Sequence, residues 1–379
     1  MTGGESGGPN AGFIARAHKI FLVFGALYAS FLVLGCIPWV QKQLIYCHWL
    51  HIPLFPDYEH PEAYGLAPYK ALSFRIATPD GESLGAWFSL PDSFHRTLHA
   101  TSPLSDSAIA SSLQSRPTIL YLHGNAATRA ARTRVEHLSS FSNRLDVNVL
   151  AIDYRGFAES TGEPSEEGLT IDAVAAFDWL VEHGAKEGDI LIAGTSLGTG
   201  VAVQAAAALE RDGKKARGVV LFAPFADVAS LLDTYYILGL VPLLKPLGVF
   251  PPFVAQTFKS FLVHKFDSLS KLKDMHQPLL LVHAEDDWDI PFSHSAKLFA
   301  SAQPEVADEI ENARDAAGAT LKGATRVVER SIERLGKLQT LERDQGRGAV
   351  AHLQTFYGAH ERVGLQEGVQ DVVRAMFDL

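Results

Sequence analysis

The chain has 379 residues, of which 47% are hydrophobic and 20% are charged. This composition excludes a disordered chain, a fibrous repeat and a small disulfide scaffold, and the length suits one large domain with appendages or two ordinary domains. The net charge of −10 argues against nucleic acid as a partner, because a duplex-binding protein presents a basic face to the phosphates. Cys36 and Cys47 both lie near the N-terminus, so the rest of the chain holds no thiolate metal ligand and no cysteine nucleophile.

An uncharged apolar run over residues 20–40 predicts a transmembrane anchor. Its roughly 21 residues would span about 30 Å as a helix, the thickness of a bilayer's hydrocarbon core. Arg16 and Lys19 precede the run and only Lys42 follows closely, so the charge bias places residues 1–19 in the cytoplasm and the remainder across the membrane. A cleaved signal peptide and a buried core helix are the alternatives, although the apolar part of a signal peptide is usually shorter, about 7 to 15 residues.

Residues 41–69 are aromatic and proline-rich and read as a juxtamembrane approach segment, which leaves residues 70–379 for the main domain. Residues 73–90 predict a β-hairpin that turns at Asp80–Gly81. The serine-rich residues 98–117 predict a polar surface insertion.

Short apolar runs then alternate with helical patterns. The runs are typical of strands buried on both faces, and they cover residues 118–123, 147–154, 190–194, 218–225 and 278–284. Helical patterns cover residues 169–184 and 198–213, the second ending at a glycine suited to a helix C-terminus. This alternation predicts an α/β fold with a mostly parallel sheet and helices on both faces.

The strongest chemical signal is Gly194-Thr195-Ser196-Leu197-Gly198, which directly follows a predicted strand and opens a predicted helix. This context is the one that a nucleophile elbow requires. The turn is too sharp for side chains at the glycine positions, and it exposes the serine hydroxyl above the sheet. Ser196 is therefore the candidate nucleophile.

A serine nucleophile needs a base and an orienting acid, which follow it along the chain in this architecture. The predicted strand 278–284 is followed by Glu285, Asp286, Asp287 and Asp289, at the edge of the sheet where ligands of such folds bind. We expect Asp287 to be the acid, because it precedes a turn that leads into a helix. Asp286 is the rival candidate. The structural alternative is that all four acids are turn or capping residues.

The base should lie between the last strand and the last helix, which selects His360. His352, inside the preceding apolar run, is expected to be a packed side chain. An oxyanion hole needs two main-chain N–H donors, and we expect them from Leu197 and from Asn125, in the His123-Gly124-Asn125 loop. An ordinary turn is the alternative for that loop.

Two further segments carry predictions. Residues 225–266 are very apolar but interrupted by prolines, and predict a cap over the active site that would suit an acyl chain, with plain core packing as the alternative. Residues 303–347 are charged, and an apolar stripe at helical spacing predicts an amphipathic helix, either solvated or bound to a membrane or partner. The stripe consists of Val328, Ile332, Leu335, Leu338 and Leu341.

The motifs YLHGNAATR, GTSLGTGVA, HAEDDWDIP and YGAHERV occur in the order found in α/β-hydrolase domain proteins, and the chain resembles this family over about residues 45–300 and 349–379. The resemblance implies an α/β-hydrolase fold with the active serine, aspartate and histidine at Ser196, Asp287 and His360. Within the family it is similar to single-anchor lipases of the endoplasmic reticulum membrane. Those enzymes have a lumenal catalytic domain and cleave monoacylglycerols or lysophospholipids.

We therefore predict a membrane-anchored serine hydrolase that cleaves acyl esters of single-chain lipids through an acyl-enzyme, with no need of a metal or an organic cofactor. A protein depalmitoylase or other thioesterase is the nearest alternative, because the same triad cleaves thioesters. A catalytically silent binding protein on a hydrolase fold is the alternative from another class.

Overall fold

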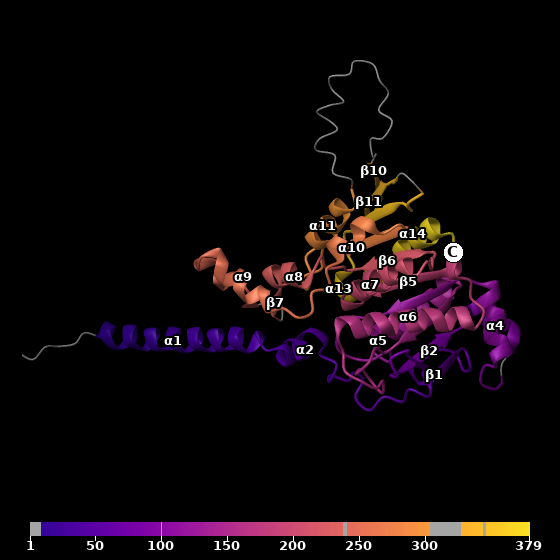
Figure 1. The fold of residues 1–379 in the computed structure, drawn as a ribbon, viewed down its shortest axis with the longest axis horizontal. Helices are drawn as coiled ribbons and strands as arrows, with labels where there is room; N and C mark the ends of the chain where they lie inside the picture. The colour runs from indigo at the N-terminus through magenta and orange to yellow at the C-terminus, as the bar shows by residue number, and fades with distance from the viewer. Residues whose placement is uncertain (1–8, 100, 238–240, 304–326, 344–345) are drawn as a thin grey trace, which may run out of the picture.

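The computed structural model describes residues 9–99, 101–237, 241–303, 327–343 and 346–379. A ten-stranded sheet runs through its main domain (Figure 1). The strand order is β1-β2-β4-β3-β5-β6-β9-β12-β11-β10. The bounds are β1 (Ala71–Ala77), β2 (Ser83–Ser89), β3 (Thr118–Leu122), β4 (Asn148–Ile152), β5 (Ile190–Thr195), β6 (Gly218–Phe222), β9 (Leu279–Ala284), β10 (Val327–Ile332), β11 (Gly336–Leu341) and β12 (Val350–Thr355).

The six central strands are mutually parallel, from β4 through β3, β5, β6 and β9 to β12. All five predicted apolar runs form strands in this part of the sheet, and every residue of these five strands is buried. The β1–β2 hairpin pairs Ala77 with Ser83 around the predicted turn. The predicted α/β class, with a mostly parallel sheet, is confirmed.

Helices cover both faces of the sheet, because alternate strand residues point to opposite sides. Leu120 and Ile192 pack in one core with helices that include α6 and α7, and Tyr121 and Leu191 pack in a second core with helices that include α5 and α14. The first face is covered by α4 (Asp106–Ser115), α6 (Glu166–Glu182), α7 (Leu197–Arg211), α10 (Ser268–Asp274) and α11 (Ser293–Ser301). The second face is covered by α5 (Arg132–Ser140), the π-helical turn η2 (Phe141–Leu145) and α14 (Glu367–Phe377).

Shorter elements complete the main domain. They are η1 (Pro61–Tyr64), α3 (Asp92–Leu98), η3 (Glu187–Asp189), α13 (Ala359–Arg362) and η5 (Val363–Leu365). The predicted terminal helix after His360 is thus three pieces, of which α14 is the longest.

The serine-rich segment 98–117 differs from the predicted polar insertion. The side chain of Ser105 caps α4 by accepting the N–H of Ala108 at 3.3 Å, and the helix buries Ile109 and Leu113 in the core. Ser105 caps the helix, Ser107, Ser111 and Ser115 are exposed, and the buried Ser112 donates to Oδ1 of Asn148 at 2.6 Å. The polar composition thus hides an ordinary amphipathic helix.

The predicted amphipathic helix within residues 303–347 is wrong for the part that the structure describes. Strands β10 and β11 form a hairpin there, with Ile332 paired to Gly336, and β11 pairs with β12. The reason is tertiary: β12 offers an open sheet edge whose backbone groups β11 satisfies. Leu335 lies in the turn and Leu341 is buried, so the apolar spacing only resembles a helical stripe. Residues 304–326 lie outside the described ranges.

The N-terminal helix α1 (Pro9–Gly35) extends away from the main domain (Figure 1). Its part Phe13–Gly35 is long and apolar enough to cross a membrane, and none of the apolar window is buried against protein. This exposure removes the core-helix alternative. The helix ends at Gly35, short of residue 40, because Pro38 begins the separate helix α2 (Pro38–Tyr46).

The segment between β6 and β9, residues 225–266, projects from the main domain on the side from which α1 extends (Figure 1). We call it the cap. Its elements are α8 (Val228–Thr234), β7 (Tyr236–Ile237), β8 (Val241–Pro242), the 3₁₀ turn η4 (Lys245–Val249) and α9 (Pro252–Ser260).

Candidate active site

Ser196 occupies the sharp turn between β5 and α7, with φ 53° and ψ −120°. A Cβ atom on Gly194 would lie 2.2 Å from the carbonyl oxygen of Gly198, and one on Gly198 would lie 2.0 Å from that of Leu122. Both positions therefore require glycine, as the sequence motif predicts. The strained serine backbone is a feature that clusters at functional sites.

The three predicted triad side chains form one hydrogen-bonded chain. The Oγ of Ser196 lies 2.8 Å from Nε2 of His360, and Nδ1 of His360 lies 2.9 Å from Oδ2 of Asp287. These residues follow β5, β12 and β9, three parallel strands whose carboxyl ends lie at the same edge of the sheet. The geometry is that of a nucleophile, a base and an orienting acid.

In the loop after β9, residues 285–290, which we call the acid loop, Asp287 and its rival Asp286 make different hydrogen bonds. Oδ1 of Asp287 accepts the N–H groups of Asp289 at 3.0 Å and Ile290 at 2.9 Å, which leaves Oδ2 directed at His360. Asp286 instead accepts the N–H of Ala359 at 2.7 Å. It therefore holds the backbone beside the histidine and does not contact the imidazole in this structure.

The charge states suit this arrangement. Burial alone would raise the pKa of Asp287, but hydrogen bonds with His283 and His360 outweigh it and hold that pKa well below its usual range. Burial would lower the pKa of His360, whereas the hydrogen bond and the charge of Asp287 together raise it. A carboxylate oxygen of Asp287, one of Asp289 and a ring nitrogen of His360 lie within 4.8 Å of one another. The negative charge of Asp289 therefore also raises the pKa of His360.

His283 is a residue that the sequence analysis did not single out. It lies fully buried in β9, with Nε2 3.2 Å from Oδ2 of Asp287 and 2.8 Å from the carbonyl oxygen of Ile290. It thus contacts the carboxylate oxygen that faces His360. Its place four residues before Asp287, at the end of a buried strand, is the only signal in the sequence.

The loop after β3 lies against the nucleophile. A Cβ atom on Gly124 would lie 3.3 Å from Cβ of Ser196, and a small cavity beside the serine is lined by Asn125 and His360 among others. Across the described ranges, the N–H groups of Asn125 and Leu197 donate to no protein acceptor. Both N–H groups are therefore free to donate to a bound group, which an oxyanion hole requires.

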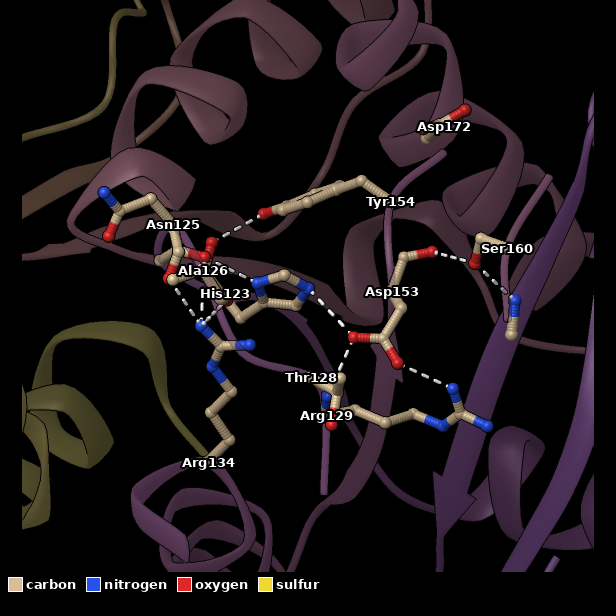
Figure 2. A network of polar contacts seen from close by, with 12 residues as sticks. His123, Asn125, Ala126, Thr128, Arg129, Arg134, Asp153, Tyr154, Ser160 and Asp172 are labelled. Atoms are coloured by element: carbon tan, nitrogen blue, oxygen red, sulfur yellow. Dashed lines mark hydrogen bonds and ion pairs between the residues drawn. The ribbon is translucent and has the colours of Figure 1, made fainter. Parts of the chain in front are cut away.

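Arg134, whose role the sequence did not predict, contacts the backbone carbonyl groups of this loop (Figure 2). Its Nη2 lies 3.1 Å from the carbonyl oxygen of Gly124, 2.9 Å from that of Asn125 and 2.7 Å from that of Ala126. Arg134 is 7% exposed and comes from the first turns of α5. One guanidinium therefore gathers three consecutive carbonyl groups and fixes the orientation of the peptide units between them.

A buried ionic cluster supports the same loop (Figure 2). Asp153 accepts Nη1 of Arg129 at 2.6 Å and lies 3.2 Å from Nε2 of His123, while the hydroxyl of Tyr154 donates to the carbonyl oxygen of His123 at 2.9 Å. Burial alone would raise the pKa of Asp153, but its contacts with His123 and Arg129 lower it. The carboxylate therefore remains charged in the core.

The approach segment completes the support of the loop. The N–H of Ala126 donates to the carbonyl of Tyr46 at 2.8 Å, and the N–H of Ala127 donates to that of Leu50 at 2.8 Å. The chain that leaves α1 thus binds directly to the loop that carries Asn125.

His352 lies apart from this chain of contacts. It is buried in β12, with Nε2 2.9 Å from the hydroxyl of Ser295, as expected for a packed side chain.

Comparison with known proteins agrees with the fold and the sequence motifs. Residues 119–340 match the model of the alpha/beta hydrolase family. The chain is 33% identical over 297 residues to lysophosphatidylserine lipase ABHD12 of Rattus norvegicus, covering 76% of this chain and 70% of that protein. It is 34% identical over 265 residues to protein ABHD12B of Homo sapiens, covering 69% of each.

Among solved structures, an alpha-beta hydrolase from Vibrio vulnificus superposes with a TM-score of 0.56 at 17% identity, covering 90% of this chain and 92% of that one. This likeness concerns the fold alone. Together with the family match and the two relatives, it establishes that the chain belongs to the alpha/beta hydrolase family.

Proposed function

We propose that this protein is a membrane-anchored serine hydrolase that cleaves the acyl ester of single-chain lipids, a monoacylglycerol or a lysophospholipid. The observation that carries the proposal is the hydrogen-bonded chain from Ser196 through His360 to Asp287. The similarity to a lysophosphatidylserine lipase supports the lipid substrate.

In the proposed mechanism, Oγ of Ser196 attacks the acyl carbonyl carbon while Nε2 of His360 takes the hydroxyl proton. The carbonyl oxygen becomes an oxyanion that accepts the N–H groups of Leu197 and Asn125. Protonated His360 then passes its proton to the departing alcohol oxygen, and the acyl group remains on the serine.

Deacylation repeats these steps with water. His360 removes a proton from a water molecule as the water attacks the acyl-enzyme carbonyl, and the imidazolium then returns the proton to Oγ of Ser196. Asp287 keeps the imidazole oriented and stabilises its positive charge throughout. The fatty acid leaves, and the resting site is restored.

The proposed acyl-binding region is the cap. Burial of a methylene group contributes about 0.8 kcal/mol, so a long acyl chain against apolar cap residues would supply much of the binding free energy. Phe225 and Phe266, at the two ends of the cap, pack against α7, the helix that begins after Ser196. A Cβ atom on Gly200 of this helix would lie 3.0 Å from the ring of Phe225 and 2.9 Å from that of Phe266.

The proposed arrangement has a cytoplasmic tail at residues 1–19, an anchor within residues 20–40 and an approach segment at residues 41–69. The hydrolase domain at 70–379 lies on the lumenal side of the endoplasmic reticulum membrane. Arg16 and Lys19 support this orientation. Lys42, on the other side of the run, is bonded to Glu163 of the main domain.

A fluorophosphonate probe tests the enzymatic core of the proposal. We expect covalent labelling of the wild type and of Ser111→Ala, a change at an exposed serine of α4, and no labelling of Ser196→Ala. Unlabelled wild-type protein would support the silent binding protein. Labelled protein that cleaves a palmitoyl-cysteine peptide faster than a lysophospholipid would support the thioesterase.

A further inference from the structure

The cap contacts α1 well inside its apolar stretch. The hydroxyl of Tyr28 donates to the carbonyl oxygen of Leu243 at 2.8 Å. Tyr28 precedes Gly35, the last residue of α1, by seven residues, which corresponds to about 10 Å along a helix axis. The cap therefore extends beside the C-terminal part of α1, as Figure 1 also shows for α9.

A second contact, at the end of α1, fixes the two segments together. Nε2 of Gln41 donates to the carbonyl oxygens of Gly35 and Phe261, both at 2.9 Å, and its Oε1 accepts the N–H of Val263 at 3.0 Å. Gln41 is 4% exposed. A Cβ on Gly35 would lie 3.3 Å from the ring of Phe258, so α9 packs directly on the helix end.

The cap also presents large apolar side chains to its surroundings. We define its outer face as Val249, Phe250, Phe253 and Phe261, whose exposed fractions are 83%, 55%, 64% and 52%. Large exposed apolar side chains grouped within one short segment mark an interaction site.

From these contacts we infer that the outer face of the cap inserts into the same bilayer leaflet that the C-terminal part of α1 occupies. The inference rests on the proposed anchor: if α1 spans the membrane, a segment bonded to Tyr28 lies below the headgroups. The occupant of the outer face is then lipid hydrocarbon. The cap enters one leaflet and returns, because its helices are too short to span.

The backbone chemistry of the cap suits this depth. Unpaired N–H groups are costly in hydrocarbon, and Pro242, Pro246, Pro251 and Pro252 have none. Two other backbone N–H groups of the cap have partners inside it. The N–H of Leu243 donates to the carbonyl oxygen of Tyr235, and the N–H of Leu247 donates to the carbonyl oxygen of Leu244.

The two lysines of the outer part of the cap are also accommodated. Nζ of Lys259 bonds to Asp233 at 2.5 Å, and Nζ of Lys245 lies 4.5 Å from the centre of the Tyr236 ring. Long lysine side chains of this kind keep their charge near the headgroups while their stems lie in the apolar layer.

Two tryptophans that follow α1 mark the surface of the membrane at the same level. Trp39 in α2 and Trp49 in the approach segment are 65% and 62% exposed, and both come after Gly35, the last residue of α1. Tryptophan favours the boundary between headgroups and hydrocarbon. A lipid substrate could then pass from the leaflet into the cap without crossing water.

Site-specific labelling of the full chain in liposomes tests the inference. In a Cys36→Ser/Cys47→Ser background, the environment-sensitive fluorophore NBD is attached to Phe253→Cys in the cap. The anchor control is Val33→Cys, which lies between Tyr28 and Gly35 and is 68% exposed. The water control is Glu333→Cys in the exposed β10–β11 turn.

We expect lipids with a nitroxide on the acyl chain to quench the NBD fluorescence at residue 253 as strongly as at residue 33. The fluorescence of the label at residue 333 should stay unchanged. Quenching at 33 with none at 253 would overturn the inserted cap and leave the anchor in place. A label at 253 that is shielded from both nitroxide lipids and water-soluble quenchers would assign the face to a protein partner, which also contradicts the inference. No quenching at 33 would instead remove the anchor itself.

Discussion

At the scale of single residues, the acid loop gives the sharpest prediction. Asp287→Asn should reduce kcat/KM for a soluble ester by about 10⁴-fold, because the amide presents the wrong hydrogen-bonding group to Nδ1 of His360. The matched control is Asp286→Asn, which weakens only the bond to the N–H of Ala359 and should be much milder. A larger loss for Asp286→Asn would mean that the acid is assigned one residue too late.

A second residue-scale prediction concerns pH. His360 acts as a base only when neutral, so activity should fall as the pH drops through its raised pKa. The carboxylate of Asp289 contributes to that rise, so Asp289→Asn should lower the pKa of His360 and move the acidic limb of the kcat/KM profile to lower pH. The control Glu333→Gln, far out on the β10–β11 turn, should leave the profile unchanged. An unshifted limb in Asp289→Asn would contradict this role.

The third prediction concerns Arg134, which we regard as a positioning residue for the loop after β3 that carries Asn125. Arg134→Ala should release the carbonyls of residues 124–126 and misplace the N–H of Asn125. Loss of one oxyanion donor costs about 10²- to 10³-fold in kcat, so we expect a loss of that order with little change in KM. Arg134→Lys should restore part of kcat, because an ammonium group can still bond these carbonyls. A merely structural role would lower the amount of folded protein and leave kcat per labelled active site unchanged.

The sequence and the structure differ in an instructive way at this scale. Ser196, Asp287 and His360 could be placed from the sequence because each lies within five residues of the end of a recognisable buried strand. Parallel strands bring their carboxyl ends together. Arg134 and His283 could not, because their importance depends on which carbonyl groups or carboxylate they meet after folding. A buried arginine on a helix has no local pattern that separates it from an exposed one.

At the scale of elements, the same contrast appears between the central and peripheral strands. The central strands are continuous apolar runs, because both of their faces are buried. Strand β10 lies at the sheet edge and is almost entirely exposed, so its sequence carries no such constraint. The apolar residues from 328 to 341 then matched a helical spacing, and only the open edge of β12 decided the outcome.

The approach segment gives an element-scale prediction. A chain that begins at residue 36 keeps the bonds from Ala126 to Tyr46 and from Ala127 to Leu50, whereas a chain that begins at residue 53 loses both acceptors. In detergent, we expect the first to retain kcat for a soluble ester and the second to lose most of it, since the loop carrying Asn125 is no longer held. Circular dichroism and thermal melting of both proteins would separate a misplaced loop from an unfolded domain. Equal kcat values would show that the loop is stable without the approach segment.

For the whole molecule, the first prediction concerns orientation. Ser105→Asn creates the sequon Asn-Asp-Ser at the start of α4, and asparagine can keep the capping role of Ser105. If the hydrolase domain is lumenal, this variant should gain a glycosidase-sensitive mass in microsomes. The control Ser105→Asn/Ser107→Ala lacks the sequon and should gain none. An unmodified single variant whose domain is digested by protease added to intact microsomes would indicate the opposite orientation.

The last prediction unites the anchor, the cap and the site in the choice of substrate. An acyl chain of about 16 to 18 carbons offers about 0.8 kcal/mol per buried methylene, and a cap that lies against the membrane can bury it. We therefore expect kcat/KM in liposomes to be much higher for a long-chain monoacylglycerol or lysophospholipid than for a triacylglycerol or an acetyl ester. A Phe250→Asp/Phe253→Asp variant should narrow this preference, because two carboxylates on the outer face of the cap oppose its insertion. If the acetyl ester is the best substrate of the wild type, the cap does not bind acyl chains, and its apolar surface serves another purpose.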